Sequence, residues 1–216
     1  YKKQKGYGVV AMTAIGGAMC DPLSRLCSED HIALLSVGGG VFTPVSFQPD
    51  PLYMTAAVSN FVEYTGAIAK WFKDDWKEER PPKVGFIMYD TPGQRIILDP
   101  DGFPAYAEEI GVEVAGYEWV PGTATDTSIE LSRLALNGAD LIIVANVAAF
   151  ACLHLRDAER VGIDVPFIVN VSGFDESIMG IAPEVADGCY GEVKTALPSE
   201  NVPGVMKARE ICSQFR

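Results

Sequence analysis

The sequence lacks the short motifs that mark metal sites and nucleotide-dependent enzymes. Its five cysteines form no C-x-x-C pair and no Cys/His spacing typical of a zinc site. No glycine-rich stretch is followed by Lys-Ser or Lys-Thr, as in a Walker A loop, and none fits G-x-G-x-x-G with an acidic residue about 20 positions later. We therefore predict no metal site and no cofactor.

Positive charge is scarce. Seventeen Lys and Arg residues stand against 29 Asp and Glu residues, which gives a formal net charge of −12. Apart from Lys2, Lys3 and Lys5, the positive residues are scattered along the chain. Such a chain repels phosphate backbones and anionic membranes, so we expect no nucleic-acid partner.

Long apolar runs are also missing. The longest candidate, from Ala139 to Leu153, is about 15 residues long and contains Asn146, whereas a bilayer span needs roughly 18. We expect a soluble chain with no direct membrane insertion. The chain starts at Tyr1 and shows no signal peptide, which indicates a processed protein or a fragment.

The odd number of cysteines leaves the disulfide pairing open. At least one thiol is free or bridges to a segment outside this sequence. Cys20 and Cys27 could pair only if the chain between them is not fully helical, because seven helical residues would separate them by about 10 Å.

What the sequence does contain is a regular alternation of strand-like and helix-like segments. Hydrophobic residues make up 48% of the chain, enough for the core of one large domain or two small ones. Helix-like apolar faces cover 60–77, 127–136 and 148–160, and a last helix is expected from about Val202. The strand-like runs are YGVVAM (7–12), IALLS (32–36), KVGFIMYD (83–90), GVEVAGYEWV (111–120), DLIIVA (140–145), PFIVN (166–170) and GCYGEV (188–193). The pattern predicts an α/β fold, with doubly wound parallel sheets covered by helices on both faces.

The alternation breaks between 41 and 59, a stretch with three prolines and no helical period, and breaks again after Lys194. Such breaks are typical of crossings between two lobes. Two helix starts carry local signals: Thr127-x-x-Glu130 reads as a capping box, and Asp21 reads as an N-cap with Pro22 at the first helical position.

Glycines gather where two of the strands end. Gly38, Gly39 and Gly40 follow one strand, and Gly16 and Gly17 follow another. Ligands of open parallel sheets bind beyond the carboxyl ends of the strands, and glycine lets backbone N–H groups approach an anion closely. The glycines therefore indicate an oxyanion site, with tight turns as the alternative.

Residues that could perform chemistry have plainer explanations. His31 precedes a core strand, where a solvated cap is expected, and His154 lies on a helix, pointing out or packing; no nucleophile stands in an elbow motif beside either. Asp90 either accepts a hydrogen bond from a ligand or caps the following turn, and Asp126 marks a helix start. The charged run at 73–80 is a solvated helix end or faces a transporter. We predict no catalytic residues.

The order of the motifs resembles a known family. VVAMTAIGGA and IALLSVGGG are followed by KVGFIMYDTPG, by GTATDTSIELSRLALNGADLIIVAN and by VPFIVNVSGFDES. This order, which covers nearly the whole chain, resembles the periplasmic binding proteins of the branched-chain amino acid type, the extracytoplasmic receptors of ABC importers.

The resemblance implies two α/β lobes that are joined by a hinge and close on a small solute. It places residues 1–57 in an incomplete first lobe, 58–194 in the second lobe, and 195–216 in a segment that returns to the first lobe. The implied partner is the membrane permease of an ABC transporter, and the implied location is periplasmic or at the cell surface. A ligand-sensing regulatory domain of the same fold is the alternative, and an enzyme is less expected.

The resemblance also implies a binding cleft, with departures from the amino-acid-binding members. Their carboxylate-binding hydroxyls would fall at Gly17 and at Gly39 or Gly40, and their acidic partner for the ligand ammonium would fall near Val171, with no carboxylate before Asp175. Pro92-Gly93 stands near the place of a family tyrosine. A buried ammonium without a carboxylate costs several kcal/mol. We therefore expect a carboxylate-bearing ligand with an apolar or aromatic body and no α-ammonium group. The expected ligand-binding residues are Gly16, Gly17, Ala18, Gly38, Gly39, Gly40, Tyr89, Asp90, Asn146, Val147, Phe150, Val171 and Phe174.

Overall fold

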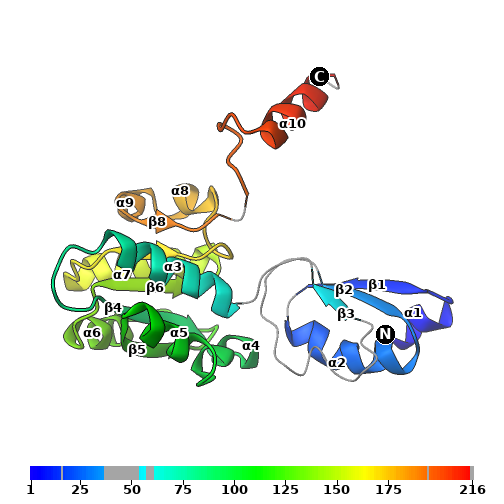
Figure 1. Ribbon diagram of the computed structural model, residues 1–216, viewed down its shortest axis with the longest axis horizontal. Coiled ribbons are helices and arrows are strands. Elements are labelled where there is room, and N and C mark those ends of the chain that lie inside the picture. Colours follow the sequence, from blue (N-terminus) through cyan, green and yellow to red (C-terminus); the bar gives the residue numbers. More distant parts are fainter. Residues whose placement is uncertain (16, 37–53, 57–60, 194, 215–216) are drawn as a thin grey trace.

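The computed structural model describes residues 1–214 apart from 16, 37–53, 57–60 and 194. Its strands form two parallel sheets, one of three strands and one of five. Figure 1 shows them as two α/β bodies, with the last helix, α10 (Pro203–Ser213), extending from the second.

The first sheet has the order β1-β2-β3, with strands at Ala11–Ala14, Ala33–Ser36 and Met54–Ala56. Helix α1 (Lys2–Gly6) precedes it, and α2 (Gly17–Glu29) connects β1 to β2. Buried and exposed residues alternate along β2. Cys20 and Cys27 of α2 pack with Leu34 of β2, so α2 covers one face of this sheet.

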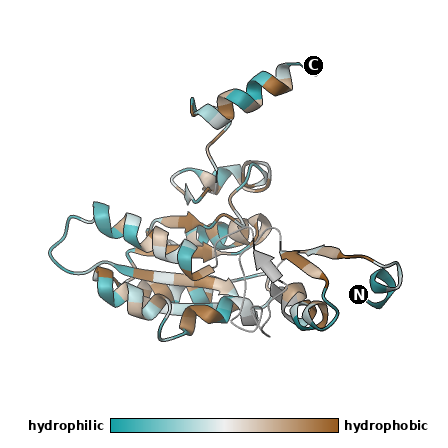
Figure 2. Ribbon diagram, turned by 45° about the vertical axis from the view of Figure 1, so that its right-hand side comes forward, coloured by the Kyte–Doolittle hydropathy of each residue, from teal (hydrophilic) through white to brown (hydrophobic). Residues whose placement is uncertain are grey.

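The second sheet has the order β5-β4-β6-β7-β8, and all its strands are parallel. Every residue of β6 is buried, as expected for a central strand that is covered on both faces. Figure 2 shows these strands as a hydrophobic layer between the helices. The strands are β4 (Lys83–Tyr89), β5 (Glu113–Val120), β6 (Leu141–Ala145), β7 (Phe167–Val169) and β8 (Tyr190–Gly191).

Helices cover this second sheet on both faces. One face packs against α3 (Phe61–Asp75) and α5 (Phe103–Ile110). The other packs against α6 (Ser128–Leu136), α7 (Ala148–Val161) and α8 (Ser177–Ile181). Short elements complete the second body: α4 (Pro92–Arg95), the 3-10 helix η2 (Ile96–Leu98) and α9 (Pro183–Ala186).

The predicted α/β class and its parallel sheets are confirmed, and six of the seven strand-like runs contain a strand at the expected place. The first run is displaced, since β1 covers Ala11–Ala14 and not 7–12. Strand β3 lies inside the stretch at 41–59, for which no strand was expected. Helix α5 was also missed, because its eight residues are too short for a clear helical period.

Of the two predicted helix starts, the one at Asp21 is wrong, and the one at Thr127 is confirmed in position but not in its capping hydrogen bond. Helix α2 already begins at Gly17, so Asp21 is not its N-cap and Pro22 lies inside the helix. Thr127 is the N-cap of α6, but its side chain makes no capping hydrogen bond because it binds Asp157 and His154. The expected end of α7 is confirmed: Gly162 follows it in the left-handed conformation, with φ of 72°.

Candidate functional site

The carboxyl ends of the central strands bring polar and aromatic residues to one edge of the second sheet. Strands β4, β6 and β7 are parallel and end at Tyr89, Ala145 and Val169. The residues that follow them therefore share this edge. They include Asp90 after β4, Asn146 and Val147 after β6, and Val171 after β7, all of which the sequence predicted as site residues.

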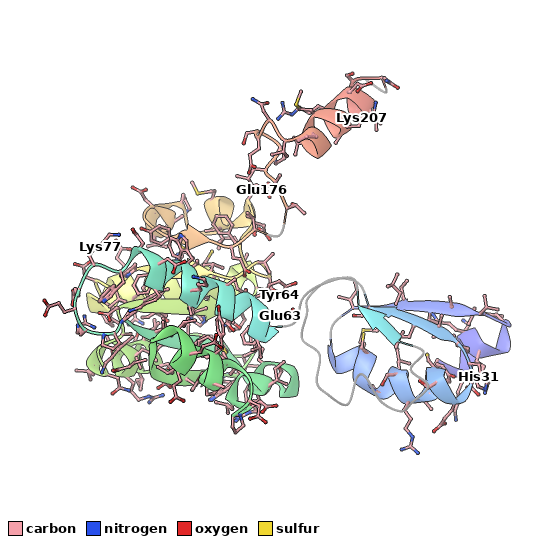
Figure 3. The ribbon with its side chains drawn as sticks, viewed as in Figure 1. His31, Glu63, Tyr64, Lys77, Glu176 and Lys207 are labelled. Atoms are coloured by element: carbon pink, nitrogen blue, oxygen red, sulfur yellow. The ribbon has the colours of Figure 1, made fainter. Side chains whose placement is uncertain are left out.

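This edge is turned toward the first body. Helix α4, which follows β4, lies at the side of the second body that is nearer the first, and it contacts α2. His31, two residues before the start of β2, lies at the opposite end of the first body (Figure 3). The carboxyl ends of the two sheets thus face each other, and the amino ends point outward.

The predicted glycines of the first body lie at that facing end or outside the described residues. Gly17 and Ala18 form the first turn of α2, directly after β1. Gly16, Gly38, Gly39 and Gly40 fall outside the described part of the chain, so their role stays a prediction.

Asp90 forms an ion pair and caps no helix. Its Oδ1 accepts a hydrogen bond from Arg95 Nε at 2.6 Å, and this bond holds the pKa of the carboxyl below its usual value. The Arg95 guanidinium lies 4.5 Å from the centre of the Trp119 ring, a cation–π contact. Thr91 is the residue that caps α4, because its Oγ1 accepts the Gln94 N–H at 3.3 Å.

Aromatic rings give this edge an apolar character. The Tyr89 and Phe150 rings meet edge to face, with centroids 4.9 Å apart. The centroids of the Phe150 and His154 rings are 6.3 Å apart. Burial raises the pKa of Tyr89. The two predicted residues Tyr89 and Phe150 are therefore brought together, beside the half-exposed Val147.

Asn146 is buried and held by His154. Asn146 Nδ2 lies 2.8 Å from His154 Nε2, and His154 Nδ1 lies 3.0 Å from Thr127 Oγ1. The Thr127 hydroxyl donates to Asp157 Oδ2 at 3.0 Å, and Arg160 donates to the other Asp157 oxygen at 2.8 Å. Burial lowers the pKa of His154 to about 4, so the ring is neutral at pH 7. Of the two expectations for His154, packing is correct.

A carboxylate lies beside Val171 after all. Glu192, which follows β8, accepts the Val171 N–H through Oε2 at 3.1 Å. Sequence reasoning looked only along the loop before Asp175 and missed this residue, because β8 brings it there from 21 positions away. Phe174, which is 38% exposed, lies against the backbone of Gly191, where a Cβ would be 2.2 Å from its ring.

Gln94 is a second residue that the sequence analysis missed. It lies on α4 and is 7% exposed, and its Nε2 donates to the backbone oxygen of Ala145 at 2.6 Å. The side chain therefore reaches from the loop after β4 to the end of β6. The only sequence signal was a polar residue shortly after a strand end, which is too common to single out.

A hollow of about 450 Å³ lies elsewhere, near the amino end of β7. It is bounded by α7 and α9 and by residues such as Ile163 and Pro166. Ligands of parallel sheets bind at the carboxyl ends of the strands, so this hollow is not the candidate site.

In the part of the chain that the structure describes, no group of three or more His, Cys, Asp or Glu side chains could hold a metal ion. Among the same residues, no helix is long and apolar enough to cross a membrane. All five cysteines are free thiols in the structure.

Solved structures with the same fold are numerous, although their sequences differ. A branched chain amino acid ABC transporter protein from Thermus thermophilus with bound valine is 17% identical, with a TM-score of 0.76 over 96% of this chain and 53% of that one. A fatty acid ABC transporter substrate-binding protein from Thermomonospora curvata is 16% identical, with a TM-score of 0.74 over 94% of this chain and 51% of that one. A leucine-binding protein from Thermotoga maritima is 14% identical, with a TM-score of 0.76 over 97% of this chain and 58% of that one.

The chain thus spans about half the length of these solved structures, and it has their type I periplasmic binding fold. No curated protein matches the sequence. The sequence profile of the periplasmic binding protein family matches residues 5–208, nearly the whole chain. The chain belongs to the periplasmic binding protein family.

Proposed function

We propose that this chain is part of an extracytoplasmic receptor of an ABC importer, which closes two lobes on a small solute and hands it over without chemistry. The observation that carries the proposal is the arrangement of the strand ends: the carboxyl ends of both sheets face each other, and α2 contacts α4. Residues 1–57 and 195–216 would belong to the first lobe and 58–194 to the second. The permease would dock on the exposed faces of both lobes.

We further propose a ligand with a carboxylate and an apolar or aromatic body. Backbone N–H groups at the start of α2 and in the glycine loop after β2 would bind the carboxylate, aided by the positive end of the helix dipole. Two or three such charge-assisted hydrogen bonds, at about 1.5 to 3 kcal/mol each, together with buried carbon, suffice for micromolar affinity. The rings of Tyr89 and Phe150 supply the apolar wall.

An α-ammonium group is not part of the proposed ligand. Glu192 is the carboxylate nearest the family's ammonium site, and it already accepts a hydrogen bond from the backbone of Val171. Asp90 is likewise paired, with Arg95. An ammonium buried in this site would have to compete with those partners for a counter-charge. Because Glu192 contacts Val171, near which the family's ammonium partner would fall, an α-amino acid is the second candidate ligand.

The test is a thermal-shift and calorimetry panel, preceded by native mass spectrometry of freshly purified protein. The panel compares 3-phenylpropanoate and 4-methylpentanoate with phenylalanine and leucine, which differ from them by the ammonium group. A bound carboxylate at 100 times its dissociation constant should add about 2.7 kcal/mol to the free energy of unfolding. Binding by the amino acids alone would reject the proposed ligand class.

A matched pair of variants separates the two ligand classes. Glu192→Gln removes the charge beside Val171, and Glu176→Gln removes a charge from an exposed position before α8. If the ligand lacks an ammonium group, both variants should bind the carboxylates as the parent chain does. A selective loss of leucine or phenylalanine binding in Glu192→Gln would instead identify Glu192 as an ammonium partner.

A further inference from the structure

Two buried side-chain oxygens at the candidate site have no hydrogen-bond partner among the described residues. They are Gln94 Oε1 and Asn146 Oδ1. Gln94 is 7% exposed and Asn146 is 2% exposed, so neither oxygen is satisfied by lying at the open surface. Buried acceptors normally have a partner, and an unpaired one costs free energy, so two of them at one sheet edge require an explanation.

The two residues are close neighbours in the fold. The Gln94 amide binds the backbone oxygen of Ala145, and Asn146 is the next residue in the chain. The last paired residues of β4 and β6 are Met88 and Ala145, so Gln94 and Asn146 both come after the end of this strand pairing.

The orientation of the Gln94 amide is fixed by its partner. A backbone carbonyl only accepts hydrogen bonds, so the group that lies 2.6 Å from the Ala145 oxygen has to be the NH₂ group. The Gln94 carbonyl oxygen is therefore the buried end of the amide that has no partner among the described residues.

The orientation of the Asn146 amide follows from the chain of hydrogen bonds behind it. The Thr127 hydroxyl donates to the carboxylate of Asp157, so it accepts from His154 Nδ1. The neutral ring then carries its proton on Nδ1, and Nε2 is an acceptor. Asn146 meets that acceptor with its NH₂ group, which leaves the Asn146 oxygen without a partner among the described residues.

The reverse arrangement is less favourable. If the Asn146 amide were flipped, His154 would carry its proton on Nε2, and Thr127 would have to turn its hydroxyl hydrogen from Asp157 to His154. That would replace a charge-assisted hydrogen bond by a neutral one, and charge-assisted bonds are about twice as strong. Arg160 binds the other oxygen of the same carboxylate, at 2.8 Å from Asp157 Oδ1.

We propose that Gln94 and Asn146 form an acceptor subsite of the second lobe, which takes a neutral O–H or N–H donor carried by the ligand. The inference rests on the proposed function, since it places this donor at the end of the ligand that is remote from the carboxylate in the first lobe. Amide oxygens are uncharged, so the subsite suits a hydroxyl or amide group better than an ammonium ion, whose buried charge it does not balance. His154 is a positioning residue that holds the Asn146 oxygen in place.

The test uses four compounds that vary the carboxylate and the donor independently. They are 3-phenylpropanoate, 3-(4-hydroxyphenyl)propanoate and the methyl esters of both, and calorimetry measures their binding to the unmodified chain. We expect the hydroxyl group to tighten binding about tenfold, the effect of one well-made buried hydrogen bond. The difference in affinity between each carboxylate and its methyl ester tests the proposed function instead.

The two proposals can therefore fail separately. If the carboxylates bind more tightly than their esters but the hydroxyl brings no gain in affinity, the acceptor subsite is overturned and the proposed function stands. If the hydroxyl tightens binding but carboxylates and esters bind equally well, the proposed carboxylate ligand is overturned and the acceptor subsite stands. Binding of none of the four compounds would overturn both.

Variants locate the effect on the two amides. Asn146→Leu and Gln94→Met keep the side-chain size and remove the acceptor, so each should reduce the hydroxyl advantage to about twofold or less while binding of 3-phenylpropanoate persists. Asn137→Leu is the matched control, because the Asn137 amide donates to Ala115 on an exposed part of β5, away from this edge. An undiminished hydroxyl advantage in both variants would overturn the assignment.

Discussion

Both sheets of this protein consist of parallel strands, but different sets of helices cover them. In the first body α2 covers one face of the sheet, and the buried core among the described residues consists of Ala14, Cys20, Cys27, Ile32 and Leu34. In the second sheet both faces are covered, and the core includes Phe61, Phe86 and Phe103 along with all of β6.

The difference shows how a parallel sheet depends on its second layer. Alternate residues of a strand point to opposite faces, so side chains stay exposed wherever no second layer covers a face. Leu35 in β2 and Val10 and Ile15 beside β1 are exposed large apolar residues of this kind. Burial contributes roughly 25 cal/mol per Å² of apolar area, so most of the stability described for this chain resides in the second body.

Truncating a core ring in the second sheet should have the largest effect. Phe86 is fully buried and packs edge to face on Phe103, with centroids 5.0 Å apart. Phe86→Ala should lower the free energy of unfolding by about 3 to 5 kcal/mol, because it leaves a cavity between the sheet and the helices α3 and α5. Urea unfolding followed by tryptophan fluorescence measures this loss.

The same truncation in the first sheet is the comparison. Leu34→Ala should cost about 2 kcal/mol, with the loss of hydrogen-exchange protection confined to the first body, because Leu34 packs on the small side chains of Cys20 and Cys27. Ile129→Ala, at an exposed position of α6, should be close to neutral. Equal losses for Leu34→Ala and Phe86→Ala, spread over both bodies, would contradict the contrast between the sheets.

Acid should destabilise the second body through His154. Burial lowers its pKa from 6.5 to about 4, so below pH 6.5 the unfolded chain binds a proton that the folded chain does not. The free energy of unfolding should therefore fall as the pH is lowered from 6.5 to about 4, by about 3 kcal/mol in total. Urea unfolding at a series of pH values gives this slope.

Two variants test the origin of the slope. His154→Gln keeps a polar side chain beside Asn146 and Thr127 and should flatten the dependence of unfolding free energy on pH. His31→Asn, which removes the exposed histidine that follows α2, is the control. Asp126, whose pKa the Ser128 backbone N–H lowers to about 2, contributes only below about pH 4. A slope that survives in His154→Gln and disappears in His31→Asn would refute the assignment.

The smallest expected effect is a gain in the first body. Pro22 lies inside α2, where its ring displaces a helix hydrogen bond. Pro22→Ala should stabilise α2 by about 1 to 2 kcal/mol, less than the full cost of an interior proline because the unfolded chain gains freedom. Hydrogen exchange of the α2 amides measures it. Pro203→Ala in the first turn of α10, where proline is well tolerated, should bring no gain, and equal gains at both sites would count against this explanation.

The fold class was predictable because its signals are local. Continuous apolar runs such as LIIVA at β6 indicate a strand buried on both faces, and Gly162 marks the end of α7 by its left-handed conformation. The capping side chains were less predictable. Thr127 does precede the first residue of α6, but its hydroxyl is used by Asp157, 30 positions away, and α2 begins before Asp21.

Part of the candidate site was also predictable. Asn146, Tyr89 and Asp90 directly follow or end strands, and parallel strands bring such residues to one edge. Gln94 and Glu192 were not, because each reaches the site through a contact with another segment: Gln94 with Ala145 and Glu192 with Val171.

The sequence alone determined the α/β class, the alternation of strands and helices, and the polar or aromatic residues at the strand ends, since each depends on periodicity within a short segment. Only the tertiary structure decided which of those groups meet. The strand order β5-β4-β6-β7-β8 places β8 beside β7 and so brings Glu192 to Val171, and packing of α7 on α6 joins His154 to Thr127. Local periodicity specifies which face of an element is buried, but the partner of a polar group depends on the whole sheet order.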